Sequence, residues 1–324
     1  MNKISLAAAA LALSAGSAFA GDLPSTKAAP VAPVVASPWD WDIGAGVTSD
    51  YMFRGITQSA HGPSVAGHGE VRYNVDSTWQ LYLGMSGESI NFNADTADLR
   101  APGSSALLGY SYGNPSMELD GDAGVRGTWG KFSTDVGAIV YSYPNTPATY
   151  WPRTYTWVEG YFKPSYNFTD WFTVGANFSF TPSYSNSGAP AEYIEGNFKW
   201  TLPDQLSAFA ISGALGYQFF SGKTDVVISG APFYNTGFAT TNPGFTLGQY
   251  PDYATWNLGV GYTWKFATLD LRYWGTNLSP AAAAQLWGTA GYDLHPNGTQ
   301  NRSDFGDQRF VATLSFDLTS KDLK

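Results

Sequence analysis

From Trp39 onward, apolar residues occupy every second position in a series of segments that turn-forming residues separate. In the first segment, Trp39, Trp41 and Ile43 alternate with Asp40 and Asp42. A period of two residues places the two sets on opposite faces of a β-strand. The same pattern predicts about twelve strands, within a range of roughly ten to fourteen. They cover 39–53, 64–75, 78–90, 117–129, 132–143, 154–168, 171–180, 191–202, 208–220, 253–266, 268–274 and 309–318.

The connections between these segments alternate strictly between short and long. The short ones are 76–77, 130–131, 169–170, 203–207 and 266–267, and the long ones are 54–63, 91–116, 144–153, 181–190, 221–252 and 275–308. Outer-membrane barrels have short periplasmic turns and long external loops, whereas a soluble sandwich has no reason to keep its long loops at one end. The pattern therefore predicts an all-β chain that folds as a transmembrane antiparallel β-barrel.

Aromatic residues gather beside the short turns and the chain end. Trp and Tyr favour the membrane interface, because one part of the ring is apolar and another can hydrogen-bond. A soluble β-protein would explain many aromatic residues but not their position next to the short turns. We predict an aromatic girdle at the periplasmic edge of the lipid, formed by Trp39, Trp79, Trp129, Trp171, Trp200, Trp264 and Phe316.

The N-terminus has the pattern of a cleaved secretory signal. A basic start with Lys3 precedes an apolar run over 4–13, which is too short to span a bilayer, and Ala18-Phe19-Ala20 fits signal peptidase. The predicted organisation is a signal peptide over 1–20, an Ala- and Pro-rich periplasmic leader over 21–38, a barrel over 39–318 and a polar tail over 319–324. These features predict the bacterial outer membrane as the location.

Composition and charge narrow the class further. Charged residues are 13% of the chain and aromatic residues 16%, and there is no Cys to form disulfides after export. Removal of 1–20 takes away Lys3 alone among the charged residues, so the net charge changes from −9 to −10. An acidic chain argues against nucleic acid as a partner. The expected partners are outer-membrane lipid, the barrel-assembly machinery and small hydrophilic solutes, and the sequence does not indicate an oligomeric state.

Several stretches resemble the TorF-type porin family. The most specific is Ser49-Asp50-Tyr51-Met52-Phe53-Arg54-Gly55-Ile56-Thr57-Gln58-Ser59, followed by Pro63-Ser64-Val65. The stretches 132–145 and 269–274 are also similar to that family, whereas 85–90 and the long loop 221–252 depart from it. The resemblance implies an outer-membrane barrel with a pore role, and it brings no catalytic residue and no defined substrate.

The predicted inward faces carry charges of both signs. Candidates for the lining of the lumen are Glu70, Arg72, Glu118, Asp120, Asp122, Arg126, Glu159, Lys163, Glu195, Lys199, Asp270 and Arg272. Either they line a narrow wet channel or they pair into a network that closes a small barrel, and an interior of about twelve strands is compatible with both. Carboxylates outnumber Lys and Arg in this set, so an open lumen is expected to pass small hydrophilic solutes with a mild cation preference, strongest near Glu118, Asp120 and Asp122.

Outer-membrane barrels can also act as hydrolases or as structural and adhesive proteins. A hydrolase would need a His base beside a Ser nucleophile, but His61 and His295 are predicted in external loops, and no Ser motif flanks His68. The sequence shows no metal-ligand cluster, and neither a cofactor nor enzymatic activity is expected. A structural or adhesive barrel with a closed lumen is the main alternative, with aromatic loops at 150–152 and 233–250 as contact candidates.

Overall fold

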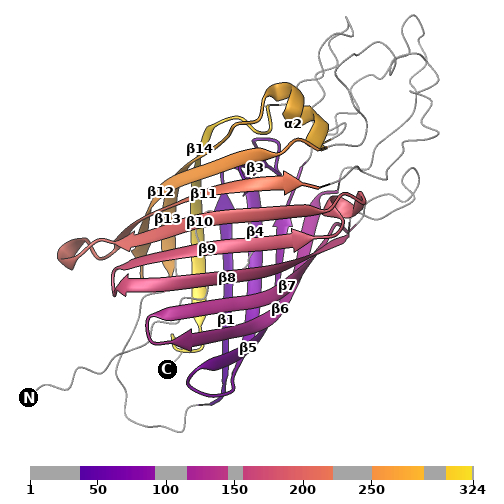
Figure 1. Cartoon of the computed structure of the whole chain (residues 1–324). Coiled ribbons are helices and arrows are strands. Elements are labelled where there is room, and N and C mark those ends of the chain that lie inside the picture. The colour runs from indigo at the N-terminus through magenta and orange to yellow at the C-terminus, as the bar shows by residue number, and fades with distance from the viewer. Residues whose placement is uncertain (1–36, 92–114, 145–155, 222–249, 288–303, 323–324) are drawn as a thin grey trace, which may run out of the picture.

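Twelve antiparallel strands form one closed barrel in the computed structural model (Figure 1). The structure describes residues 37–91, 115–144, 156–221, 250–287 and 304–322. Each barrel strand pairs with its neighbours in sequence, and β1 pairs with both β4 and β14 to close the ring. The predicted signal peptide, most of the leader, and the loop residues 150–152 and 233–249 lie outside the described residues.

The barrel strands agree closely with the predicted segments. They are β1 (Trp39–Thr48), β4 (Ser64–Asn74), β5 (Trp79–Ser89), β6 (Met117–Trp129), β7 (Phe132–Ser142), β8 (Trp157–Thr169), β9 (Phe172–Thr181), β10 (Ala191–Thr201), β11 (Phe209–Phe220), β12 (Tyr253–Trp264), β13 (Ala267–Thr276) and β14 (Arg309–Thr319). A separate two-stranded sheet joins β2 (Met52–Phe53) to β3 (Ile56–Thr57), and the described helices are α2 (Pro280–Trp287) and the short 3₁₀ turns Tyr184–Asn186 and Asp204–Leu206.

Two predicted boundaries need correction. The first strand was expected to continue to Phe53, but β1 ends at Thr48, where the Oγ1 hydroxyl bonds to the carbonyl of Asp50 and the chain turns inward. At the other end, Thr319 belongs to β14 rather than to the polar tail. Ser320 then donates its N–H to the carbonyl of Trp41, so β1 also holds the start of that tail.

The outer surface of the barrel is apolar. Along β5, Leu81, Leu83 and Met85 are 45 to 66% exposed, whereas the alternate residues Tyr82 and Glu88 are buried. An exposed apolar band around a whole barrel is stable only where it meets lipid. The fold is therefore a transmembrane β-barrel, as predicted from the two-residue period.

The long and short connections lie at opposite ends of the barrel, here called the loop end and the turn end. β1 begins and β14 finishes at the turn end, as the pairing of Asp42 with Thr319 shows. Each residue of the predicted girdle is 39 to 60% exposed, and Trp79 meets Trp129 edge to face with ring centroids 5.0 Å apart. No helix in the described part of the chain has the length and hydrophobicity needed to cross a membrane.

Candidate pore and its inner hairpin

The connection between β1 and β4 folds into the barrel. This inner hairpin, residues 49–63, contains the β2–β3 sheet, and its residues Tyr51, Met52 and Ile56 are 1 to 2% exposed. The prediction of an external loop over 54–63 is therefore wrong, and so is the external position expected for His61. The physical reason is that the segment carries apolar side chains that gain free energy by burial against the inner wall.

Arg54 at the tip of the hairpin reaches the far wall of the barrel. Its Nη2 lies 2.6 Å from Oε1 of Glu159 on β8, and its Nη1 donates to Oε1 of Gln218 on β11 at 2.8 Å. The guanidinium also lies over the ring of Tyr193 on β10, 4.3 Å from the centroid. β8 to β11 lie opposite β1 and β4 in the strand order, so Arg54 spans the lumen.

Gly55 fits closely against two further strands. A Cβ atom at this position would come within 2.5 Å of Oγ1 of Thr255 on β12 and 2.6 Å of Cγ2 of Thr276 on β13. Its φ of 80° is also in the left-handed region, which glycine adopts without strain. The tip of the hairpin therefore depends on a glycine for both its backbone and its close approach to the wall.

Aromatic side chains complete the closure of the loop end. Tyr141 on β7 stacks on Trp157 on β8, with ring centroids 4.2 Å apart, and Tyr184 packs against Trp157 at 5.0 Å. Ile56 of the inner hairpin and Leu286 of α2 belong to the same buried cluster. Figure 1 shows α2 at the loop end of the barrel, above the strands. An apolar core thus fills this part of the lumen.

An acidic patch faces the hairpin from β5 and β6. Glu88 is the direct cross-strand neighbour of Glu118, and Asp120 follows two positions along; each is 2% exposed. The hydroxyl of Tyr51 on the hairpin is buried in the same region. Within the described residues, the carboxylate of Asp120 has no hydrogen-bond partner. The patch therefore gathers three carboxyl groups beside the hairpin.

Ion pairs cover the wall nearer the turn end. Arg126 on β6 donates to Glu70 on β4 at 2.7 Å and to Asp135 on β7 at 3.0 Å, and its guanidinium lies 3.9 Å from the ring centroid of Tyr82. Arg72 extends the network by pairing with Glu70 and with a carboxylate of β1. These residues hold neighbouring strands together and leave few buried charges without a partner.

A second network lies on β11 to β13. Arg272 donates to Asp270 at 3.0 Å, to Oδ1 of Asn257 at 2.6 Å and to Oγ of Ser212 at 2.7 Å. Both members of the Arg272–Asp270 pair are nearly fully buried. All the residues of this network lie on β11, β12 and β13, so it stabilises the barrel wall.

The polar interior is more open away from the hairpin. His68 lies between Asp42 and Asp317, with Nε2 3.8 and 3.6 Å from their carboxylates, and its side chain is 31% exposed. Asp317 is 38% exposed, and Glu195 and Lys199 on β10 are half-buried. These partly exposed charged side chains define the interior away from the hairpin, here called the vestibule.

The predicted lining residues differ in how far they are buried. Those that are buried are Glu70, Glu118, Asp120, Arg126, Glu159, Asp270 and Arg272, and those that are half-buried are Arg72, Asp122, Lys163, Glu195 and Lys199. Sequence reasoning missed the hairpin residues Arg54 and Tyr51 and the wall residue Gln218. The apolar residues Met52 and Ile56, which are unusual in an exposed loop, were the available signal.

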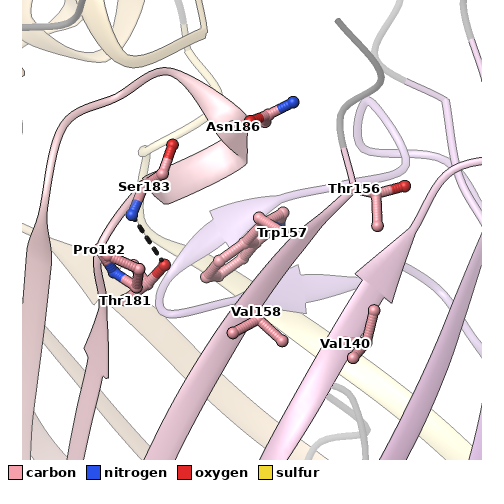
Figure 2. Close-up of a pocket in the computed structure, with 8 residues that line it drawn as sticks. All are labelled: Val140, Thr156, Trp157, Val158, Thr181, Pro182, Ser183 and Asn186. Atoms are coloured by element: carbon pink, nitrogen blue, oxygen red, sulfur yellow. Dashed lines mark hydrogen bonds between the residues drawn. The ribbon is translucent and has the colours of Figure 1, made fainter.

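A pocket of about 290 Å³ opens on the outer surface near the loop end, next to β8 and β9 (Figure 2). The outward side chains of Val140 and Val158 line its lower part, and the segment 181–186 lines the other side. The ring of Trp157 lies between β8 and that segment, where Ser183 N–H donates to Oγ1 of Thr181. The pocket is continuous with the lipid-facing surface.

The described residues offer no group of three or more His, Asp or Glu arranged to hold a metal ion.

Solved structures with a similar arrangement are outer-membrane porins and transporters. The NanC porin has a TM-score of 0.46 at 11% identity and covers 86% of this chain and 100% of its own. The KdgM porin in complex with disordered oligogalacturonate has a TM-score of 0.37 at 10% identity, covering 86% and 98%. The toluene transporter TodX of P. putida has a TM-score of 0.42 at 10% identity, covering 87% and 90%.

No curated protein matches the sequence of this chain. A family model does match, and it spans nearly the whole barrel, from residue 32 in the leader to residue 314 in β14. The chain therefore belongs to the Gcw_chp family, which is described as a bacterial protein of unknown function.

Proposed function

We propose that this protein is an outer-membrane channel for passive diffusion of small hydrophilic solutes, with a mild preference for cations. The observation that carries the proposal is the charged vestibule, in which His68, Glu195 and Asp317 stay partly exposed inside a lipid-facing barrel. A low-dielectric wall focuses the field of an acid-rich interior, which attracts cations and repels anions. The likeness of the stretch 49–59 to the TorF-type porins supports the same role.

In this proposal the inner hairpin is the movable constriction. Its two strands form their own sheet and are not part of the barrel ladder. The tip is held by side-chain contacts of Arg54 with Glu159 and Gln218, so the hairpin can leave the far wall without opening the barrel. The short turns would face the periplasm and the loop end the outside, as is usual for outer-membrane barrels.

The second candidate is a structural or adhesive barrel with a closed lumen. The aromatic cluster around Tyr141, Trp157 and Tyr184 favours it, because these rings and the hairpin fill the loop end. A hydrolase has no observation of its own to support it among the described residues.

Planar-bilayer recordings of the refolded protein test the proposal. We expect discrete conductance steps and, across a KCl gradient, a reversal potential of the sign that marks cation preference. An Arg54→Ala variant, in which the far-wall contact is removed, serves as the matched open form. If neither protein conducts above background, the channel is rejected in favour of the closed barrel. Anion preference would show that charges other than the acidic wall dominate.

A further inference from the structure

The base of the inner hairpin is organised around one carboxylate. Asp50 accepts hydrogen bonds from Ser59 Oγ at 3.0 Å, from Thr57 Oγ1 and from Nδ1 of His61 at 3.2 Å. Asp50 is 3% exposed, and Arg309 at the start of β14 places its Nε 3.6 Å from Oδ2. The two ends of the hairpin are thus joined to each other through Asp50.

His61 also joins the hairpin to a different part of the chain. Its Nε2 lies 3.2 Å from Oδ1 of Asp304, and its ring packs edge-on against Phe305 with centroids 5.6 Å apart. Thr57 donates its N–H to the carbonyl of Phe305 at 3.0 Å in the same region. The imidazole therefore bridges two carboxylates, one on the hairpin and one on the segment before β14.

The strength of the contacts between His61 and the two carboxylates depends on the protonation state of the imidazole. A protonated imidazole can donate from Nδ1 to Asp50 and also attracts the nearby carboxylate of Asp304, whereas a neutral ring carries no charge and can donate from one nitrogen only. The charged groups that face His61 are these two carboxylates and Arg309, so the site carries one negative charge in excess before the ring is protonated.

We propose that His61 is a proton-dependent fastener of the inner hairpin, which holds it in the lumen when protonated and loosens it when neutral. The effect on solute passage rests on the proposed channel function, but the fastening itself does not. At acidic pH the hairpin closes the loop end, and at alkaline pH it leaves the far wall more often.

The charges around His61 favour the protonated form of its ring. Burial acts against the charged ring, but the hydrogen bond to Asp50 and the charge of Asp304 outweigh burial and the opposing charge of Arg309, so the pKa of His61 is raised above its ordinary value. A raised pKa means that the stabilisation is present at low pH and is lost as pH rises through the raised value.

Hydrogen exchange followed by mass spectrometry on the full-length protein in nanodiscs tests the fastening. The observable is the protection factor of peptides over 50–63, which corrects for the chemical pH dependence of exchange. We expect it to fall about tenfold between about pH 5 and about pH 9, corresponding to ~1.4 kcal/mol, while peptides of β6 and β7 stay unchanged.

Three variants show whether the result is specific to this bridge. His61→Asn cannot be protonated but tolerates the left-handed backbone at this position, where φ is 62°, and should remove the pH dependence. Asp304→Asn should reduce it, and His68→Gln, which changes the other described histidine, should leave it intact. If His61→Asn keeps the profile of the unmodified protein, the fastener is refuted.

Bilayer recordings over the same pH range separate the two proposals. Conductance that rises with pH in the unmodified protein but not in His61→Asn supports both. If protection changes as expected and no conductance appears at any pH, the channel fails and the fastener stands. If conductance is present but neither protection nor conductance changes with pH, the fastener fails and the channel stands.

Discussion

Arg54 and Glu159 are 105 residues apart in the sequence, yet Nη2 of the guanidinium lies 2.6 Å from Oε1 of the carboxylate, on the side of the barrel opposite to the hairpin's own strands. Both side chains are less than 10% exposed. This one ion pair therefore connects the inner hairpin to the opposite wall of the barrel across the lumen.

Replacement of Arg54 by Ala should release the tip of the hairpin. Removal of one partner from a buried ion pair costs ~3–5 kcal/mol, because the remaining charge is left buried without compensation. That cost is relieved when the hairpin moves and water reaches Glu159, so single-channel conductance is expected to rise severalfold. Bilayer recordings measure it.

Arg272→Ala is the matched control for that variant. It also removes a buried arginine from an ion pair, with Asp270, but this pair belongs to the barrel wall. Conductance should change less than in Arg54→Ala, even if thermal stability falls more. Equal conductance in both variants would show that Arg54 does not control the lumen.

Gly55→Ala should also release the tip of the hairpin, but through steric overlap and backbone strain rather than through loss of an ion pair. The new Cβ would overlap Thr255 and Thr276 and would force a positive φ on a residue with a side chain. We expect the tip to withdraw and conductance to rise while the barrel still assembles. Gly188→Ala, at a φ of 81° in the 182–190 connection, imposes about 1 kcal/mol of similar backbone strain and should leave conductance unchanged.

The acidic side chains on the inner face of β6 should determine the preference of the channel for cations over anions. Asp120→Asn combined with Asp122→Asn removes two carboxyl groups from the inner face of β6. Since a unit charge acts on a nearby ion with about 1 kcal/mol even in water, we expect the cation-to-anion permeability ratio to fall by roughly twofold to fivefold. The reversal potential across a salt gradient reports this ratio. An unchanged ratio would place the selective charges elsewhere.

Substitution by Arg should destabilise the barrel at one position of β11 and have little effect on stability at the neighbouring position. Leu215 is 66% exposed on the lipid face, and Ala214 faces the lumen opposite Asn197. Leu215→Arg near the middle of the strand should destabilise the folded barrel by ~2–4 kcal/mol, whereas Ala214→Arg should cost little because its charge stays in the wet interior. Urea titration of folding into liposomes measures both, and similar losses would contradict the assigned faces.

The barrel itself could be predicted from the sequence because its wall has one simple physical rule. Lipid on one face and a polar interior on the other force a period of two, which is why β6 was predicted residue for residue over Met117–Trp129. The inward position of Glu118, Asp120 and Arg126 follows from the same alternation.

The inner hairpin could not be predicted in this way. Its segment is too short for a period, and its place depends on Glu159, Gln218 and Thr276, which lie far along the chain. The same limit applies to the pairing of Arg126 with Glu70, since strand alternation gives the face of a residue but not its partner.

The hairpin is encoded near the beginning of the chain, but much of its support comes from the end. Thr48 bonds to Thr313 on β14, and Thr57 bonds to Phe305 just before that strand. The hairpin can therefore take its final position only after the last strand has joined the first. Contacts between such distant segments form late in folding. We therefore expect each newly assembled molecule to pass through a stage in which the ring is complete and the hairpin has not yet reached its final position.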